Sequence, residues 1–155
     1  MRLIGYVLLF LSCASSGIIL AGYYKEKIYL SQAYVNMLSS ISEKIDILHL
    51  PLSKIYESLR DNELEKIGYL DNPKAFGLTK TYEKYQNKLL FDYEHIDFCE
   101  KLGTMPHGDT VKLCQYEINR LSRLLDKQKE HYEKKIKLSP ALSILIGLAV
   151  IILII

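Results

Sequence analysis

The chain of 155 residues lacks the sequence signatures of the common enzyme classes. It contains no tryptophan and none of the motifs G-x-x-x-x-G-K-[ST], G-x-G-x-x-G or G-x-S-x-G, and its eight glycines are scattered. Those motifs form the loops that bind phosphates and dinucleotides and the turn that carries a hydrolase serine. We therefore predict a protein that is not an enzyme and that binds no cofactor.

Cysteine is also scarce, and it suggests neither a disulfide framework nor a metal site. The three cysteines are an odd number without C-x-x-C spacing, which agrees with a reducing cytoplasm. His95 and Cys99 stand four residues apart on one face of an expected helix, but zinc needs three or four protein ligands and no second pair follows. We expect a half-buried histidine beside a core cysteine, and no metal.

Charge is missing from both ends of the chain, in residues 3–24 and 138–155. A helix needs about 20 apolar residues to cross a hydrocarbon core of ~30 Å. The first run is long enough, whereas the second, roughly 27 Å long at 1.5 Å per residue, is slightly short. Snorkelling of Lys137 and local bilayer thinning can absorb that difference. Residues 1–24 and 138–155 are therefore predicted to be transmembrane helices.

Two other interpretations of the N-terminal run are less favoured. A cleaved signal peptide is disfavoured because the sequence has no small-x-small cleavage site near Ala21, where Ile19 occupies the minus-three position. A lipoprotein signal ending at Cys13 has a poor preceding sequence and would leave an apolar run in water. A retained anchor needs no processing signal. The small residues of the two runs either form faces for helix contact or are simply tolerated there. They are Gly17 and Gly22 with Ser15 and Ser16 in the first run, and Gly147 with Ser143 in the second.

Residues 25–137 hold all 18 acidic residues and 19 of the 20 basic ones, well interspersed, so nucleic acid is not an expected partner. Their number suits one compact domain. The positive-inside rule places this domain in the cytoplasm and both termini across the membrane, although Arg2 argues weakly the other way. The rule rests on the lysines beside the two runs: Lys25, Lys27, Lys134, Lys135 and Lys137.

The domain is predicted to be helical almost throughout, because apolar residues recur at steps of three and four. The first helix continues the N-terminal span without a breaker and ends before Pro51, which starts a short helix over residues 51–59. Its expected buried stripe is Leu30, Tyr34, Met37, Ile41, Ile45 and Leu48.

A second set of helices follows. Gly77 marks a break, after which residues 79–90 and 92–102 suit two short helices, and 103–108 is a loop. Asp109 fits as N-cap of the longest helix, which runs on to the second span, with a possible kink at Pro140. Of the 12 tyrosines, those near residue 24 suit an interfacial belt and the others the rim of the core. The fold class is an all-α, membrane-anchored bundle of about five to six helices.

In the order and spacing of these features the chain resembles the stage III sporulation protein AB family of endospore-forming bacteria. The resemblance rests on the two end spans and on short motifs between them. Lys54 stands where the family has an acidic residue, and Asp109 is the nearest substitute for an aspartate expected at Pro106. The residues that carry the resemblance are Pro51, Leu52, Leu59, Phe98, Leu102, Gly103 and residues 142–148.

The resemblance implies a non-enzymatic scaffold of the channel complex between mother cell and forespore, in the outer forespore membrane. It implies a fold like the cytoplasmic F domain of type II secretion platforms. The implied partners are a cytoplasmic ATPase similar to stage III sporulation protein AA and other membrane proteins of the channel. The implied contact residues are Pro51, Leu52, Lys54, Leu59, Leu102, Gly103 and Asp109. Two alternatives stay open: a platform component of a type II secretion or type IV pilus-like system, and a lipoprotein or sensor that uses Cys13.

Overall fold

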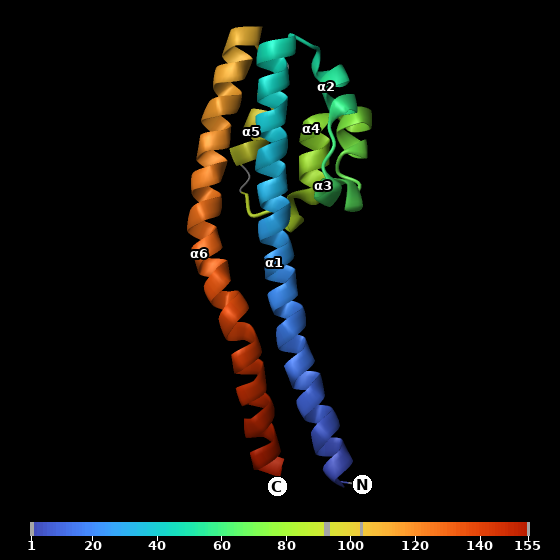
Figure 1. Cartoon of the computed structure of the whole chain (residues 1–155), viewed down its shortest axis with the longest axis vertical. Coiled ribbons are helices and arrows are strands. Elements are labelled where there is room, and N and C mark those ends of the chain that lie inside the picture. Colours follow the sequence, from blue (N-terminus) through green and yellow to red (C-terminus); the bar gives the residue numbers. More distant parts are fainter. Residues whose placement is uncertain (1, 92–93, 103, 155) are drawn as a thin grey trace. The chain divides into compact units, whose positions relative to one another are not determined.

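The computed structural model describes residues 2–91, 94–102 and 104–154. These residues form six α-helices and a short 3-10 helix, and none of them lies in a strand (Figure 1). The all-α class is therefore confirmed. Gly103 and the first two residues of the helix expected over 92–102 lie outside the described residues. The elements are α1 (Arg2–Leu48), α2 (Leu52–Ser58), α3 (Asn62–Lys66), α4 (Asp71–Tyr85), η1 (Gln86–Lys88), α5 (Glu94–Lys101) and α6 (His107–Ile154).

The chain divides into two compact units. The first, called the helix pair, consists of Met1–Glu26 and Gln128–Ile155, which belong to α1 and α6. The second, called the helical body, is Lys27–Lys127. Both long helices contain a stretch that is long and apolar enough to cross a membrane.

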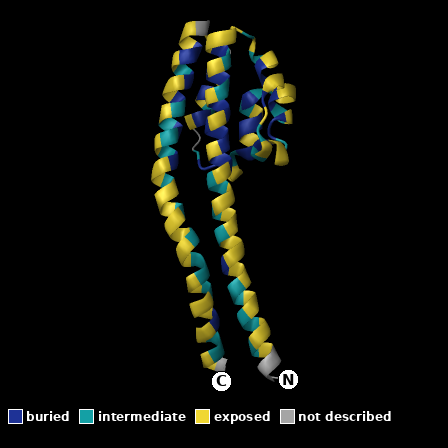
Figure 2. Cartoon of the chain, viewed as in Figure 1, coloured by how far each residue is buried: buried dark blue, intermediate teal, exposed yellow. Residues whose placement is uncertain are grey.

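Most described residues of the helix pair are exposed (Figure 2), and most of its large apolar side chains are among them. Ile18 and Ile19, for example, are 65% and 72% exposed. This surface is costly in water but suits hydrocarbon, where lipid tails are as apolar as leucine. Association of the two helices must therefore come from close packing and hydrogen bonds between them.

The predicted continuity of the first helix is confirmed, because α1 is unbroken from Arg2 to Leu48. Five of the six stripe residues are buried, but Leu48 is 53% exposed, so that assignment is wrong. The helix ends at this residue: His49 has a φ of 49°, in the left-handed region, and Pro51 follows. The chain turns away before Leu48 can be covered.

The short elements follow their sequence signals. Pro51, with extended φ and ψ of −65° and 146°, precedes α2. The Asp61 carboxylate caps α3 by accepting hydrogen bonds from the backbone N–H groups of Glu63 (3.0 Å) and Leu64 (3.2 Å). The break predicted at Gly77 is confirmed, since its φ of 79° and ψ of 169° interrupt α4.

Helix α6 starts earlier than predicted. It begins at His107, and the Pro106 carbonyl accepts from the N–H groups of Asp109 (3.1 Å) and Thr110 (3.0 Å). Asp109 is thus in the first turn and is not the N-cap. The helix continues through Pro140 to Ile154. Four apolar residues in its first half, Val111, Cys114, Leu121 and Leu125, are buried.

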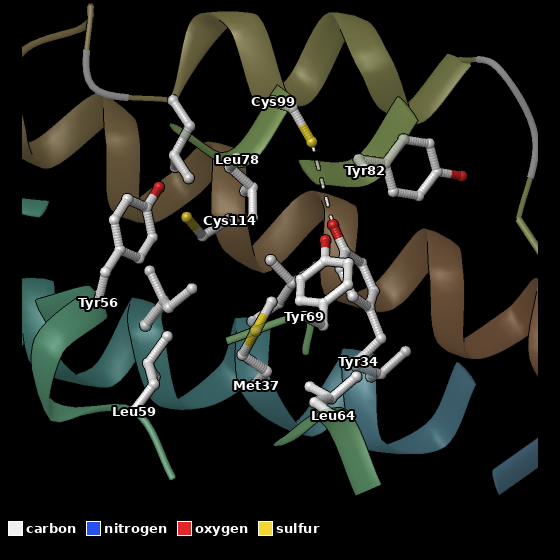
Figure 3. Packing of buried hydrophobic residues seen from close by; sticks show 14 of the residues in the cluster. Tyr34, Met37, Tyr56, Leu59, Leu64, Tyr69, Leu78, Tyr82, Cys99 and Cys114 are labelled. Carbon is white, nitrogen blue, oxygen red and sulfur yellow. Dashed lines mark hydrogen bonds between the residues drawn. The ribbon is translucent and has the colours of Figure 1, made fainter. Parts of the chain in front are cut away.

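Several tyrosines lie inside the core of the helical body and not at its rim. Tyr69 and Tyr82 are fully buried beside Tyr34 of the buried stripe, so placing these two tyrosines at the rim of the core was wrong (Figure 3). The Tyr34 ring centroid lies 5.6 Å from that of Tyr69 and 5.9 Å from that of Tyr82. Aromatic pairs at such distances add about 0.5–1.5 kcal/mol beyond area burial. These rings fill the space between α1, α4 and the turn after α3.

Candidate functional site

The residues implied as partner contacts fall into two groups. Pro51, Lys54 and Asp109 have exposed side chains and Leu52 is half-buried. Leu59 and Leu102, in contrast, are core residues with 6% and 8% exposure, and Gly103 lies outside the described residues. In the free protein only the first group presents side chains that a partner can touch.

The exposed group lies at the end of the helical body where α1 stops and α6 starts (Figure 1). The two helices run side by side there, since residues of both line a shallow groove of about 430 Å³. Its lining residues are Ser39, Ser42, Glu43, Asp46, Gln115, Ile118 and Asn119.

Three large apolar side chains are exposed at this same end. Ile47 is 66% exposed, Leu48 53% and Met105 38%. We call these three residues the apolar end. Sequence reasoning missed them, because Leu48 continued the buried stripe and Met105 stood in a loop. Solvent-exposed apolar groups of this size are ordinary when single, whereas a group gathered at one end is a candidate contact surface.

A chain of polar side chains crosses the interior of the helical body. We call Tyr34, His95, Cys99, Glu117 and Arg120 the His95 network. His95 Nδ1 lies 2.6 Å from Glu117 Oε1, and His95 Nε2 contacts the Tyr34 hydroxyl. The same hydroxyl points toward Cys99 Sγ, 3.9 Å away (Figure 3). Residues from α1, α5 and α6 therefore meet in one network.

Arg120 closes the network on its solvent side. Its Nε and Nη2 atoms donate to Glu117 Oε2 (2.9 Å) and Oε1 (2.7 Å), and Nη1 donates to Glu94 Oε2 (2.9 Å). Burial by itself raises the pKa of Glu117. Hydrogen bonds from His95 and Arg120, together with the positive charge of Arg120, outweigh burial, so that pKa lies below its ordinary value of 4.5. Glu117 is ionised at neutral pH.

These charges assign the protons of the network. The ionised Glu117 carboxylate accepts from His95 Nδ1–H. Burial raises the pKa of Tyr34 well above its ordinary value, so its hydroxyl keeps its proton and donates to His95 Nε2. Burial likewise raises the pKa of the Cys99 thiol to about 12. The network holds three helices in one register.

The sequence-based expectation for His95 was half right. The histidine does lie beside a core cysteine, but it is fully buried, with 0% exposure, and is not half-buried. Its partners Tyr34 and Glu117 were missed. A signal existed for Glu117, which stands on the buried face of α6 between Cys114 and Leu121. Among the described residues, His, Cys, Asp and Glu side chains nowhere gather in threes around a possible metal position.

The helix pair packs through small residues. A Cβ atom on Gly17 would lie 2.4 Å from Ser143 Oγ, and Ser139 Oγ donates to the Gly17 carbonyl at 3.3 Å. A Cβ atom on Gly147 would lie 3.2 Å from the Cys13 Cβ. The interpretation as contact faces thus holds at these two glycines. Gly22 has open space around it, with nothing within 4 Å of an added Cβ.

Comparison with protein families adds an independent finding. The model of the stage III sporulation protein AB family matches residues 77–155, just over half of the chain. The match starts at the break in α4 and includes α5, all of α6 and the second apolar run. The first apolar run and α2 with its preceding Pro51 lie outside it. No curated protein and no solved structure matches the chain.

Proposed function

Because the chain belongs to the stage III sporulation protein AB family, which gives it a role in sporulation, we propose that it is a membrane scaffold of the channel complex between mother cell and forespore. The scaffold has no enzymatic activity of its own. Two observations support this role: two helices able to cross a membrane, and a body in which the buried Tyr34, His95 and Glu117 side chains are engaged with one another.

In this proposal the helical body lies in the mother-cell cytoplasm. Lys25 follows the first apolar run, and Lys134, Lys135 and Lys137 precede the second. Lysines concentrate on the cytoplasmic side of a membrane protein. The helix pair then lies in the outer forespore membrane, where it meets the other membrane proteins of the channel.

The apolar end is the proposed docking surface for the cytoplasmic ATPase, which resembles stage III sporulation protein AA. The observation that carries this assignment is the exposure of Ile47, Leu48 and Met105 beside Lys54 and Asp109. Apolar anchors with a polar rim are the usual anatomy of a protein interface. Ile47 and Met105 are solvent-exposed, so changing them leaves the core intact.

A binding measurement tests the docking surface. Ile47→Asp and Met105→Asp should each weaken binding of the ATPase to the full-length protein in detergent by at least about tenfold, because a charge replaces an apolar anchor. Phe76→Asp is the matched control, since Phe76 is 62% exposed but lies on α4. Wild-type affinity in both variants would contradict the assignment.

The sporulation role has its own test. Deleting the gene in its host should block development after engulfment begins, and the count of heat-resistant spores should fall sharply. A normal count would refute the role. If docking is the essential step, a strain with Ile47→Asp should show the same block while the protein stays in the membrane.

A further inference from the structure

Within the helix pair, aromatic rings from both helices meet around one lysine. The ring centroids of Tyr24 and Tyr132 are 5.1 Å apart. The Lys135 ammonium lies over both rings, 5.6 Å from the Tyr24 centroid and 5.3 Å from the Tyr132 centroid. Cation–π contacts at these distances fix a lysine that would otherwise move freely. Residues from both ends of the chain therefore contribute to this cluster.

The cluster stands at the boundary of both uncharged runs. Tyr24 is the last residue of the first run, and Lys135 lies three residues before the second. Deeper in the pair, Gly17 meets Ser139 and Ser143, and Cys13 meets Gly147. These contacts define an antiparallel register that brings the two boundaries to the same level. Lipid phosphates lie at such a boundary.

The charge around the cluster is positive. The flanking segments of the pair hold the lysines 25, 129, 134, 135 and 137 against the glutamates 26, 130 and 133. Lys134 is engaged with Glu130 at 2.9 Å. Lys135, in contrast, has aromatic partners and no carboxylate partner within the described part of the chain. Its charge is held in place but is not neutralised.

We propose that Lys135, held by Tyr24 and Tyr132 and assisted by Lys25, binds the phosphate of an anionic phospholipid. Basic groups between transmembrane helices at the interface bind such headgroups. The tyrosine hydroxyls can donate to phosphate oxygens, and the exposed apolar faces of the pair accommodate the acyl chains. The site needs the helix pair to lie in a membrane. It does not need the ATPase, so its failure and that of docking can be told apart.

Lipid retention by the purified full-length protein tests the site. The protein is placed in nanodiscs of equal phosphatidylglycerol and phosphatidylcholine, released, and the retained lipids are counted by native mass spectrometry. Wild type should retain phosphatidylglycerol preferentially. Lys25→Gln with Lys135→Gln should reduce the preference by about 25-fold, at roughly fivefold per lysine. Tyr132→Leu, which keeps every charge, should lose part of the preference.

Lys74→Gln with Lys80→Gln is the matched control, because both lysines are exposed on α4 and lie outside the helix pair. It should retain lipid as wild type does. Excess soluble glycerol 3-phosphate should not displace the lipid, because it lacks acyl chains. The proposal is overturned if wild type retains the two lipids equally, if the control loses as much preference as the test variant, or if glycerol 3-phosphate competes fully.

Discussion

The ionised Glu117 carboxylate accepts a hydrogen bond from the His95 ring inside an otherwise apolar core, with side chains 5% and 0% exposed. Buried pairs of this kind add little net stability over apolar residues of the same shape, but removing one partner is strongly destabilising. Because hydrogen bonds are directional, the contact between His95 on α5 and Glu117 on α6 lets these helices fit together in a single register. We interpret the His95 network as the feature that fixes how these helices and α1 pack.

Glu117→Gln tests this interpretation, because it replaces the charged carboxylate by a neutral amide of similar shape. The substitution should lower the free energy of unfolding by about 1–3 kcal/mol at neutral pH, because His95 and Arg120 lose a charged acceptor. The measurement is thermal unfolding of the full-length protein in detergent, followed by circular dichroism. Glu130→Gln, at an exposed ion pair, is the control and should cause no measurable change.

Wild type and Glu117→Gln should also differ in how their stability depends on acid pH. A carboxyl group whose pKa is lowered on folding stabilises the folded state above its ordinary pKa of 4.5, and that stability is lost as pH falls through the lower folded pKa. Wild type should therefore lose stability below about pH 4.5, and Glu117→Gln should lose less over the same range. Parallel acid profiles would contradict the assigned charge.

Two buried thiols give a second prediction for single residues. Burial raises the pKa of Cys99 to about 12 and that of Cys114 to about 11. In a Cys13→Ser background the folded protein at pH 8 should resist maleimide, while the denatured protein should take up two equivalents by mass spectrometry. Rapid labelling of the folded protein would show that the core is open. These cysteines are consequently unsuited to mapping the sides of the membrane.

At the scale of elements, proline and glycine marked boundaries well because their restrictions are local. Pro51 and Gly77 interrupt helices where the sequence predicts, since a proline or a left-handed φ acts on its own backbone. The start of α6 was misplaced because the Pro106 carbonyl accepts the first backbone bonds, which a side-chain capping rule does not consider. Tyr34 and Glu117 could not be paired from sequence, since their contact depends on how helices meet.

Gly17 supports a prediction about the helix pair. Gly17→Ala should hold the two helices apart, because the new Cβ would lie 2.4 Å from Ser143 Oγ. Gly22→Ala is the control, with open space at that position. The measurement is the rate of disulfide formation between Cys13 and Gly147→Cys, whose Cβ atoms would be 3.2 Å apart. Equal rates in both alanine variants would contradict close packing at Gly17.

At the scale of the whole molecule, fold class and family followed from the sequence because both rest on patterns that extend over long segments. Uncharged runs and three/four spacing need no tertiary information, and the family resemblance is confirmed over residues 77–155. The surface that binds a partner, in contrast, could not be predicted from such patterns. It depends on which side chains remain exposed after packing, and so Leu59 and Leu102 were grouped with Pro51 although they lie in the core.

The central claim is a helical body in the cytoplasm tethered by two membrane helices, and labelling of one engineered cysteine tests it most directly. Lys80→Cys is placed on the exposed surface of α4 in a Cys13→Ser background, where Cys99 and Cys114 are buried. In intact protoplasts of non-sporulating cells that express the protein in the plasma membrane, a membrane-impermeant maleimide should leave it unlabelled, lysis should expose it fully, and the protein should stay in the membrane pellet in carbonate. Labelling before lysis, or release into carbonate, would contradict the claim.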